Sequence, residues 1–514
     1  MKKLSKMLEC ICWGIFILFV SHKLFADSIR YDEAVEWYVS KSNFNNMYNL
    51  IISTFQPPLY NVVMHFWLLV NDSSEWFRIF NIVCEVLGGI ALYKSVKVIT
   101  HEKVWGYITL AISLCCCSLL YYNQICGEYP LVLCCIAWCI YFFVNCMDHF
   151  NPKDLLLWVF FCVLSMYTQY GAFIPIVSMA IVLFLALLQD KNWRMLKQFM
   201  IYCSVAAVIA GGFLIKFFLI IQMQHQEAAT GLELSIDRLI KEPFEALQFL
   251  IYAFSTRHHY RNVVMGALLT FVVFCMLLSK KEGISGFWNR KLTWHFVACI
   301  ITWFIYCLST WTGIYGYGVF GSRHTIICLP FLIYTATVAI WIFYSLLMSC
   351  ELNNMLKNVC KCSLLVVLSI NIYNSYEYID NHWSYEQDDR AYEIWCDNVN
   401  EKTATYVYWY CTPQFMYYHG ISADNFYQYR MEGNERIENI LFPKFSEDIG
   451  YDGFEEYFLE KYGELQDRYI FIYSHDGNEI DNVMHLFKDK GYTENVLLNE
   501  NATKVFLFER NDNG

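Results

Sequence analysis

The chain has 514 residues, 57% of them hydrophobic, and its mean hydropathy of +0.31 is too high for an ordinary soluble protein. The formal net charge of −11 argues against nucleic acid as a partner, because phosphate binding requires a basic surface. Aromatic residues make up 18% of the chain, which is typical of the tyrosine and tryptophan belts of membrane proteins.

The first apolar segment, Cys10–Phe25, follows the basic tail Lys2–Lys6. Positive charge stays in the cytoplasm, so the N-terminus is predicted to be cytoplasmic and the first loop, residues 26–77, to lie on the outer face. Because Ala26-Asp27 is a poor match to a cleavage site, the segment is expected to remain as an anchor.

Spanning the hydrocarbon takes about 17–25 apolar residues, and eleven segments meet or approach this length. They are Cys10–Phe25, Arg78–Val96, Val104–Tyr121, Tyr129–Met147, Asp154–Tyr167, Ala172–Leu188, Phe199–Ile221, Val263–Ser279, Trp294–Trp311, Thr325–Met348 and Cys362–Tyr373. An odd number of spans from a cytoplasmic start places the C-terminus outside the cytoplasm.

The apolar stretch Pro57–Val70 decides the topology. It is about 14 residues long and contains Asn61 and His65, and a stretch of that length more often lies at the interface or re-enters than spans. With this stretch outside the membrane, the basic connecting loops fall on the cytoplasmic side, as the positive-inside rule requires. Their basic residues are Lys94, Lys97, Lys103, Lys153, Lys191, Arg194, Lys197, Lys280, Lys281, Arg290, Lys291, Lys357 and Lys361.

Beyond Tyr373 the chain becomes polar and acidic, and helical patterns alternate with strand patterns. The sequence therefore predicts a polytopic α-helical membrane domain over residues 1–375 and an extracytoplasmic α/β domain over residues 376–514. The elements expected in the second domain are helices at 389–400 and 479–490, strands at 405–411 and 468–474, and a closing strand pair at 495–498 and 504–509.

The cysteines and histidines do not predict a metal site. The 22 cysteines mostly lie within apolar runs, where cysteine acts as a small hydrophobe, and none has the spacing of zinc ligands. Cys396 and Cys411 lie in the predicted external domain, and two free thiols are favoured over a disulfide. The neighbours His258 and His259 cannot share one helix face, which argues against a metal pair.

Two adjacent carboxylates, Asp32 and Glu33, begin the first outer loop. A carboxylate at a water-poor interface is a serviceable general base for a hydroxyl, and Asp32 shares a helical face with Glu36. The alternative is that Asp32 caps the helix that follows, which aspartate does well.

Cationic residues of the outer loops are candidates for binding a phosphate. Arg78 opens a predicted span, where it either binds phosphate or anchors the helix at the headgroups. Arg257, Arg323 and His324 form either a site for a lipid phosphate or a basic rim that meets the headgroups. Glu128 either adds a carboxylate to the site or satisfies Arg78.

The motifs of the outer loops together resemble the GT-C superfamily of polyprenyl-phosphate-sugar-dependent glycosyltransferases. The resemblance is closest to the branch of protein O-mannosyltransferases and aminoarabinose transferases, and it covers residues 1 to about 373. The motifs are Tyr31-Asp32-Glu33, Gln56-Pro57-Pro58-Leu59-Tyr60, Ser74-Glu75-Trp76-Phe77-Arg78, Tyr122-Asn123-Gln124, Glu128-Tyr129-Pro130-Leu131, Thr168-Gln169-Tyr170 and Ser322-Arg323-His324. There are two departures: Gly127-Glu128 stands where the branch often has an arginine, and His324 where it usually has a tyrosine.

The resemblance implies a GT-C fold of about 11 transmembrane helices and an inverting transfer of a sugar from a polyprenyl-phosphate donor to an acceptor hydroxyl. Asp32 would take the proton of the acceptor, and Glu33 would position Asp32 or a sugar hydroxyl. The residues expected to bind the donor and its phosphate are Arg78, Arg323, Arg257, His324, Glu128, Gln56 and Tyr60. The scheme requires no cofactor, although some relatives use a divalent metal.

Two other functions compete with this one: a flippase or other transporter of lipid-linked sugars, and a non-catalytic subunit of envelope polysaccharide assembly. Transporters show internal repeats and ionisable residues at mid-membrane. This chain has no internal repeat, and its charges gather at the outer ends of the spans, with Lys216 as the exception. The sequence leaves open which sugar is moved and whether the acceptor is protein, lipid, teichoic acid or capsular polysaccharide.

Overall fold

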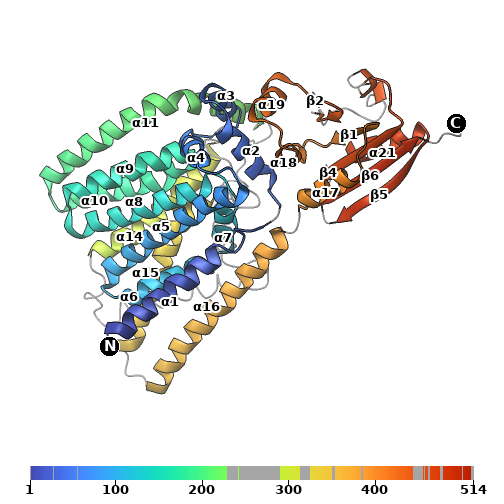
Figure 1. The fold of residues 1–514 in the computed structure, drawn as a ribbon. Helices are drawn as coiled ribbons and strands as arrows, with labels where there is room; N and C mark the ends of the chain where they lie inside the picture. Colours follow the sequence, from blue (N-terminus) through green and yellow to red (C-terminus); the bar gives the residue numbers. More distant parts are fainter. Residues whose placement is uncertain are drawn as a thin grey trace. The chain divides into compact units, whose positions relative to one another are not determined.

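A computed structural model describes residues 2–26, 28–54, 56–228, 241, 243, 290–312, 325–349, 354–383, 386–443, 455–456, 458–460, 463–474, 479–500 and 502–510 (Figure 1). The chain forms two compact units. Unit 1 comprises Met1–Leu24, Thr54–Val63 and Glu75–Ile379, and unit 2 comprises Phe25–Ser53, Met64–Ser74 and Asp380–Gly514.

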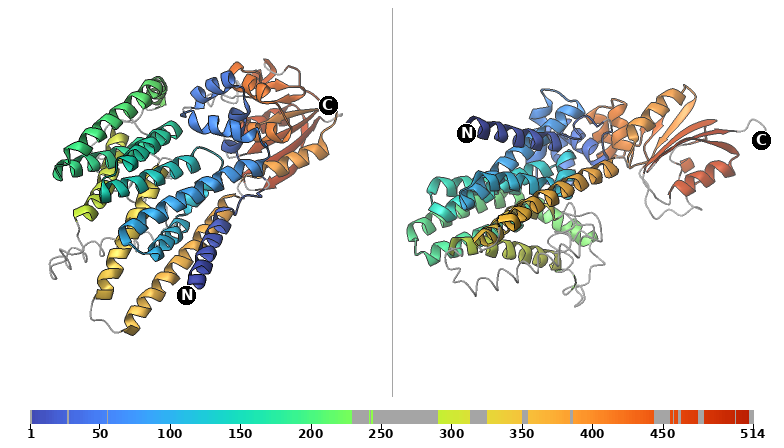
Figure 2. Two further views of the ribbon diagram at one scale, coloured as in Figure 1. Left: turned by 60° about the vertical axis from the view of Figure 1, so that its left-hand side comes forward. Right: turned by 90° about the horizontal axis from the view of Figure 1, so that it is seen from below.

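Unit 1 is a bundle of long helices, several of which lie side by side in both figures (Figures 1 and 2). Its described helices are α1 (Lys2–Val20), α5 (Ser74–Thr100), α6 (Lys103–Leu114), α7 (Cys117–Gln124), α8 (Tyr129–His149), α9 (Pro152–Thr168), α10 (Phe173–Gln189), α11 (Trp193–Ala228), α14 (Arg290–Trp311), α15 (Leu329–Ser349) and α16 (Asn354–Trp383). Short 3₁₀ turns, η1 (Tyr170–Ala172) and η3 (Ile326–Cys328), precede α10 and α15.

The helices of unit 1 divide into central and peripheral ones. Helix α8 is central: 78% of its most apolar stretch is buried, and residues such as Val132, Ile136 and Phe143 lie in the core. Helix α16 is longer, with 30 residues, yet only 6% of its most apolar stretch is buried, and Leu365 and Ile370 are exposed. Exposed apolar side chains along a whole helix fit a surrounding of lipid, which is as apolar as leucine.

Six described helices are long and apolar enough to cross a membrane, and a seventh span results if the bent pair α6–α7 is counted as one. The predicted segments other than Val263–Ser279 fall on helices of unit 1, and that segment lies outside the described residues. The multi-pass helical architecture is therefore confirmed, whereas the number of eleven spans stays a prediction.

Helices α6 and α7 meet at 74°, at a break within the cysteine triplet predicted to lie inside a span. A break frees backbone carbonyls that must find other donors in an apolar environment. The hydroxyl of Ser375, in α16, donates to the carbonyl oxygen of Cys115 at 2.9 Å and satisfies one of them.

The stretch Pro57–Val70 forms a single short helix, α4 (Leu59–Leu68), of 10 residues. At 1.5 Å per residue it is about 15 Å long, roughly half the thickness of the hydrocarbon. The helix is too short to cross a membrane by itself, in agreement with the predicted interfacial position. The turn before it, Pro57-Pro58, restricts the backbone so that a helix begins only at Leu59.

Unit 2 is built on a six-stranded sheet with the strand order β2-β3-β1-β4-β6-β5. The strands are β1 (Thr403–Val407), β2 (Arg436–Ile437), β3 (Ile440–Leu441), β4 (Arg468–Ser474), β5 (Tyr492–Glu500) and β6 (Thr503–Arg510). Strand β1 is parallel to both β3 and β4, whereas β6 is antiparallel to its two neighbours, β4 and β5. The predicted α/β class is confirmed, and the predicted strand 468–474 coincides with β4.

Helices cover both faces of this sheet. On one face α17 (Asp388–Asn398) lies against β1, and the indole N–H of Trp395 donates to the hydroxyl of Thr405 at 2.7 Å. The next residue of β1, Tyr406, points to the opposite face, because side chains alternate along a strand. That face carries α21 (Glu479–Asp489), whose Phe487 stacks on Phe508 of β6 at a centroid distance of 4.6 Å.

Most of the first loop, within Phe25–Ser53 and Met64–Ser74, also belongs to unit 2, although about 350 residues of sequence separate it from the sheet. Its helices are α2 (Tyr31–Lys41) and α3 (Phe44–Thr54). Helix α2 packs on α18 (Thr412–Tyr418) and α19 (Ala423–Tyr427), and Tyr38 stacks on Phe426 at 4.3 Å with an interplanar angle of 9°. The hydroxyl of Tyr418 accepts from the backbone N–H of Ile29 at 2.7 Å.

A buried carboxyl near this packing gives unit 2 a pH-dependent stability. Asp388 accepts a 2.9 Å hydrogen bond from the side-chain amide of Gln414, and its burial, together with nearby negative charge, raises the pKa of this carboxyl well above its usual value. The unfolded chain releases this proton near pH 4, so the contribution to stability is full below that pH and falls as pH rises towards the folded-state pKa, by up to about 1.4 kcal/mol per pH unit.

We therefore expect Asp388→Asn, which cannot ionise, to raise the apparent unfolding temperature at pH 8 and to reduce the loss of stability between pH 6 and pH 8. Thermal unfolding of the full-length protein at both pH values measures the effect. Asp397→Asn, a change at an exposed carboxylate farther along the same helix, is the matched control and should leave the pH profile as it is in the unmodified protein. A steep profile retained by Asp388→Asn would contradict the assignment.

Candidate active site

The two adjacent carboxylates occupy the first turn of α2 and have different environments. Asp32 is exposed, whereas Glu33 is fully buried, with 0% of its surface accessible. The carboxylate of Glu33 accepts the backbone N–H of Arg30 at 3.0 Å, and Arg30 is the extended residue that precedes the helix. Glu33 therefore fulfils the acidic half of a capping box, in which the third helical residue satisfies the backbone just before the helix.

This geometry excludes the capping interpretation of Asp32, whereas its role as a general base stays a prediction. The helix begins at Tyr31, so Asp32 is its second residue and not its N-cap, and the acceptor for the N–H of Arg30 is supplied by Glu33. Glu36, predicted to share a face with Asp32, is buried. Asp32 is thus the carboxylate of this turn that can meet a substrate, and Glu33 holds the turn in place.

Replacing Glu33 tests whether its hydrogen bond to the backbone N–H of Arg30 stabilises the start of α2. We expect Glu33→Ala to cost about 1–2 kcal/mol of stability, because a buried backbone N–H loses its acceptor. Glu33→Gln keeps an oxygen at the same position and should cost less in both stability and turnover. Thermal unfolding and kcat of the two variants measure this. Equal losses in both would show that the charge of Glu33, rather than its hydrogen bond, is what matters.

Three residues of the C-terminal part of unit 2 surround Tyr31, the neighbour of Asp32. The rings of Trp409 and Tyr410 contact the ring of Tyr31 at centroid distances of 6.3 Å and 5.6 Å, both edge to face. Arg430 hydrogen-bonds the Tyr31 hydroxyl; burial raises the pKa of this phenol, and the guanidinium partly offsets that rise. No motif in the sequence pointed to these three residues, because each is nearly 400 positions away from Tyr31.

The other predicted site residues that the structure describes lie in unit 1. Arg78 is in the second turn of α5 and only 3% exposed, which does not fit an anchor that reaches out to the headgroups. Tyr60 is buried in α4 and contacts Phe80 of α5 at 6.3 Å. Gln56 is partly buried before α4, and Glu128 is buried immediately before α8.

Arg257, Arg323 and His324 lie outside the described residues, so their predicted roles stay predictions. The same holds for metal dependence. Over the part of the chain that the structure describes, three or more histidine, cysteine, aspartate or glutamate side chains do not come together as metal ligands would.

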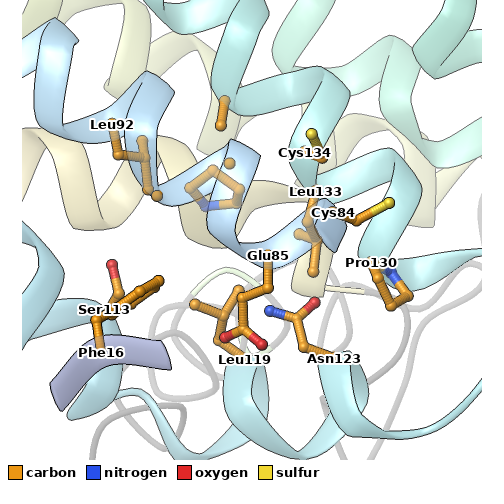
Figure 3. A pocket seen from close by; sticks show the side chains of 14 residues that line it. Phe16, Cys84, Glu85, Leu92, Ser113, Leu119, Asn123, Pro130, Leu133 and Cys134 are labelled. Carbon is orange, nitrogen blue, oxygen red and sulfur yellow. The ribbon is translucent and has the colours of Figure 1, made fainter. Parts of the chain in front are cut away.

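A polar pair that sequence reasoning missed lies within unit 1. Glu85 of α5 and Asn123 of α7 are both buried, they hydrogen-bond each other, and both line a mostly apolar pocket with Leu119, Leu133 and Pro130 (Figure 3). An ionisable group inside a helical membrane unit usually has a function. The signal was present in the sequence, since Glu85 interrupts the predicted span Arg78–Val96.

The long helices with lipid-compatible surfaces and the attached α/β sheet define a multi-pass membrane protein whose exposed carboxylate lies on a short loop helix. Comparison with known proteins makes this class more specific. Residues 55–221 match the family model of dolichyl-phosphate-mannose-protein mannosyltransferases. A search of curated proteins by sequence finds no match.

Among solved structures, the chain is similar to ArnT from Cupriavidus metallidurans, crystallised bound to undecaprenyl phosphate and in the apo state. Identity is 11% and the TM-score 0.52 in both comparisons. The first covers 97% of each chain and the second 98%. The chain therefore has the GT-C fold that its motifs predicted, and the two alignments cover 97% and 98% of it.

Proposed function

We propose that this protein transfers a sugar from a polyprenyl-phosphate donor to an acceptor hydroxyl at the outer face of the cytoplasmic membrane, with inversion at the anomeric carbon. One observation carries the proposal: an exposed carboxylate, Asp32, stands on a helical turn that a second, buried carboxylate, Glu33, braces. Two neighbouring carboxylates in unlike environments are typical of sites in which one acts chemically and the other supports it.

In the proposed reaction, the acceptor oxygen attacks the anomeric carbon of the donor sugar while Asp32 takes the proton of that hydroxyl. A new bond forms from the anomeric carbon to the acceptor oxygen, and the bond from that carbon to the phosphate oxygen breaks on the opposite side. The bonding electrons leave with the polyprenyl phosphate. A single displacement of this kind inverts the configuration.

The leaving phosphate is already an anion, so it needs positive charge rather than a proton. Arg78 is the first candidate, because it is a buried arginine at the start of a long helix and planar guanidinium groups bind phosphate with two hydrogen bonds. Arg323, Arg257 and His324 are further candidates from the sequence. Gln56, Tyr60 and Glu128 complete the proposed donor site, and the scheme requires no metal.

ArnT has been crystallised with undecaprenyl phosphate, which supports a polyprenyl phosphate as the carrier here too. We propose that the N-terminus of this chain is cytoplasmic and that unit 2 is extracytoplasmic, as the distribution of lysine and arginine predicts. Labelling of a residue in the 31–41 helix by a membrane-impermeant reagent in intact cells tests this orientation.

The buried residue Glu85 favours a second candidate function. A buried ionisable residue in the middle of a helical membrane unit is a feature of transporters, and it favours a flippase of lipid-linked sugars as the alternative. Purified protein given a radiolabelled polyprenyl-phosphate sugar, together with membranes from the producing cells, separates the two. A transferase releases free polyprenyl phosphate and moves the label to another product, whereas a flippase leaves the donor intact.

A further inference from the structure

The carboxyl end of strand β1 is where the topology of unit 2 places a ligand site. After β1 the chain runs to β3 on one side of it, and after β3 it crosses to β4 on the other side. In open α/β sheets, ligands bind outside the carboxyl ends of the parallel strands, at the point where connections lead in opposite directions. In this sheet, β1 is that point.

The residues at this end of β1 are aromatic. Trp409 and Tyr410 follow the strand directly and stack on each other at a centroid distance of 3.6 Å with an interplanar angle of 29°. Both are partly exposed, as is Tyr31, whose ring contacts both of them. We call these three side chains the aromatic ledge.

Arg430 stands at the side of the ledge, where it hydrogen-bonds the Tyr31 hydroxyl. It belongs to η4, a single π-helical turn at Gln428–Glu432 in the connection from β1 to β3, and this turn ends at Gly433 with a left-handed φ of 74°. Such turns are rare, and proteins use them often at functional sites. The guanidinium brings several fixed N–H donors to the edge of the aromatic ledge.

A partly exposed stacked pair of aromatic rings, here Trp409 and Tyr410, with hydrogen-bond donors nearby suits a sugar ring. One face of a pyranose presents C–H groups, which the electron-rich face of an aromatic ring attracts, while the hydroxyl groups point outward to polar partners. The ledge adjoins Asp32 through Tyr31, and a general base must lie within hydrogen-bond reach of the hydroxyl that it deprotonates. The substrate beside Asp32 in the proposed reaction is the acceptor.

We propose that the aromatic ledge and Arg430 bind a sugar ring of the acceptor, so that the acceptor is a saccharide or carries one at its reactive end. This inference rests on the proposed transferase function. It gives the C-terminal part of the chain a direct role in choosing the acceptor, and it makes Trp409, Tyr410 and Arg430 specificity-determining residues.

Binding is measured apart from turnover, by saturation-transfer difference NMR on the full-length protein in nanodiscs. The probes are the methyl glycosides of glucose, galactose, mannose and N-acetylglucosamine. We expect ring protons of at least one probe to receive saturation from the unmodified protein, and Trp409→Leu or Arg430→Gln to weaken its binding about fivefold to tenfold. Trp193→Leu changes an exposed tryptophan of unit 1 and should leave binding unchanged.

Retention of the probe by a folded Trp409→Leu protein, or saturation of none of the four probes by the unmodified protein, would overturn the inference. A second measurement distinguishes acceptor from donor. Native mass spectrometry of bound polyprenyl-phosphate glucose should show the same occupancy in Trp409→Leu as in the unmodified protein, and a loss there would assign the ledge to the donor sugar and refute the acceptor role. Because neither readout depends on catalysis, failure of the transferase proposal is detected separately, by unmodified protein that leaves a radiolabelled polyprenyl-phosphate sugar intact.

Discussion

Replacing Asp32 with asparagine is expected to lower the rate of sugar transfer about 10²–10⁴-fold, the usual contribution of a general base. The amide has nearly the same shape as the carboxylate but cannot accept the proton of the acceptor hydroxyl. Since Asp32 is exposed and Glu33, not Asp32, satisfies the backbone before the helix, the fold should not change. The rate is measured with purified protein from the release of free polyprenyl phosphate.

The matched control is Asp72→Asn, which removes a carboxylate from the same unit. Asp72 pairs with Lys41 at 2.9 Å, its side chain is 60% exposed, and exposed ion pairs contribute little to stability. Its loss should leave transfer almost unchanged. Normal transfer by Asp32→Asn would refute the general-base assignment, and equal losses in both variants would point to charge in general rather than to Asp32.

Replacing Phe426 with alanine is expected to be the most damaging change in unit 2 outside the site itself. Phe426 is 1% exposed and stacks on Tyr38 of α2, and the hydroxyl of Tyr38 in turn donates to the carbonyl oxygen of Ile421 at 3.1 Å. Removal of a buried phenylalanine ring costs about 3–5 kcal/mol. The helix that carries Asp32 should then detach more often from α18 and α19, and transfer should fall.

Hydrogen exchange locates this effect. Amides of residues 31–41 should exchange faster in Phe426→Ala, whereas those of β4 and β6, deeper in the sheet, should change less. Phe44→Ala in the same unit is the control, because Phe44 is 55% exposed and its removal should alter stability by less than about 0.5 kcal/mol. Unchanged exchange in α2 together with normal transfer would show that α2 does not depend on this packing.

The sequence predicted the parts of the structure that short-range patterns encode. Long apolar runs marked the helices of unit 1, and the run of aromatic and β-branched residues in Arg468–Ser474 marked β4. The brevity of the Pro57–Val70 stretch correctly indicated a helix too short to span. The motif around Asp32 and Glu33 identified the first turn of α2, although only the structure shows that Asp32 is exposed and Glu33 buried.

The features that remained hidden depend on contacts between distant residues. Strands β2 and β3 have two residues each, too few for any periodic signal. In the sequence, nothing distinguishes Trp409, Tyr410 and Arg430 from other residues of an α/β domain. Only the folded chain shows that they contact Tyr31. Each compact unit consists of three separate stretches of the chain. The change in composition along the sequence indicated a single boundary near residue 375 and could not show this division.

The pairing of Ile29 with Tyr418 joins positions 389 residues apart and has a consequence for how the protein is made. At about 5–20 residues per second, a ribosome needs roughly 20–80 s to reach the second position after the first has emerged. Throughout that time helix α2, which carries Asp32, lacks the helices α18 and α19 on which it packs in the folded protein. We therefore expect newly synthesised chains to lack the proposed transfer activity until translation is almost complete, and a truncated product that has inserted all its helices correctly to be inactive.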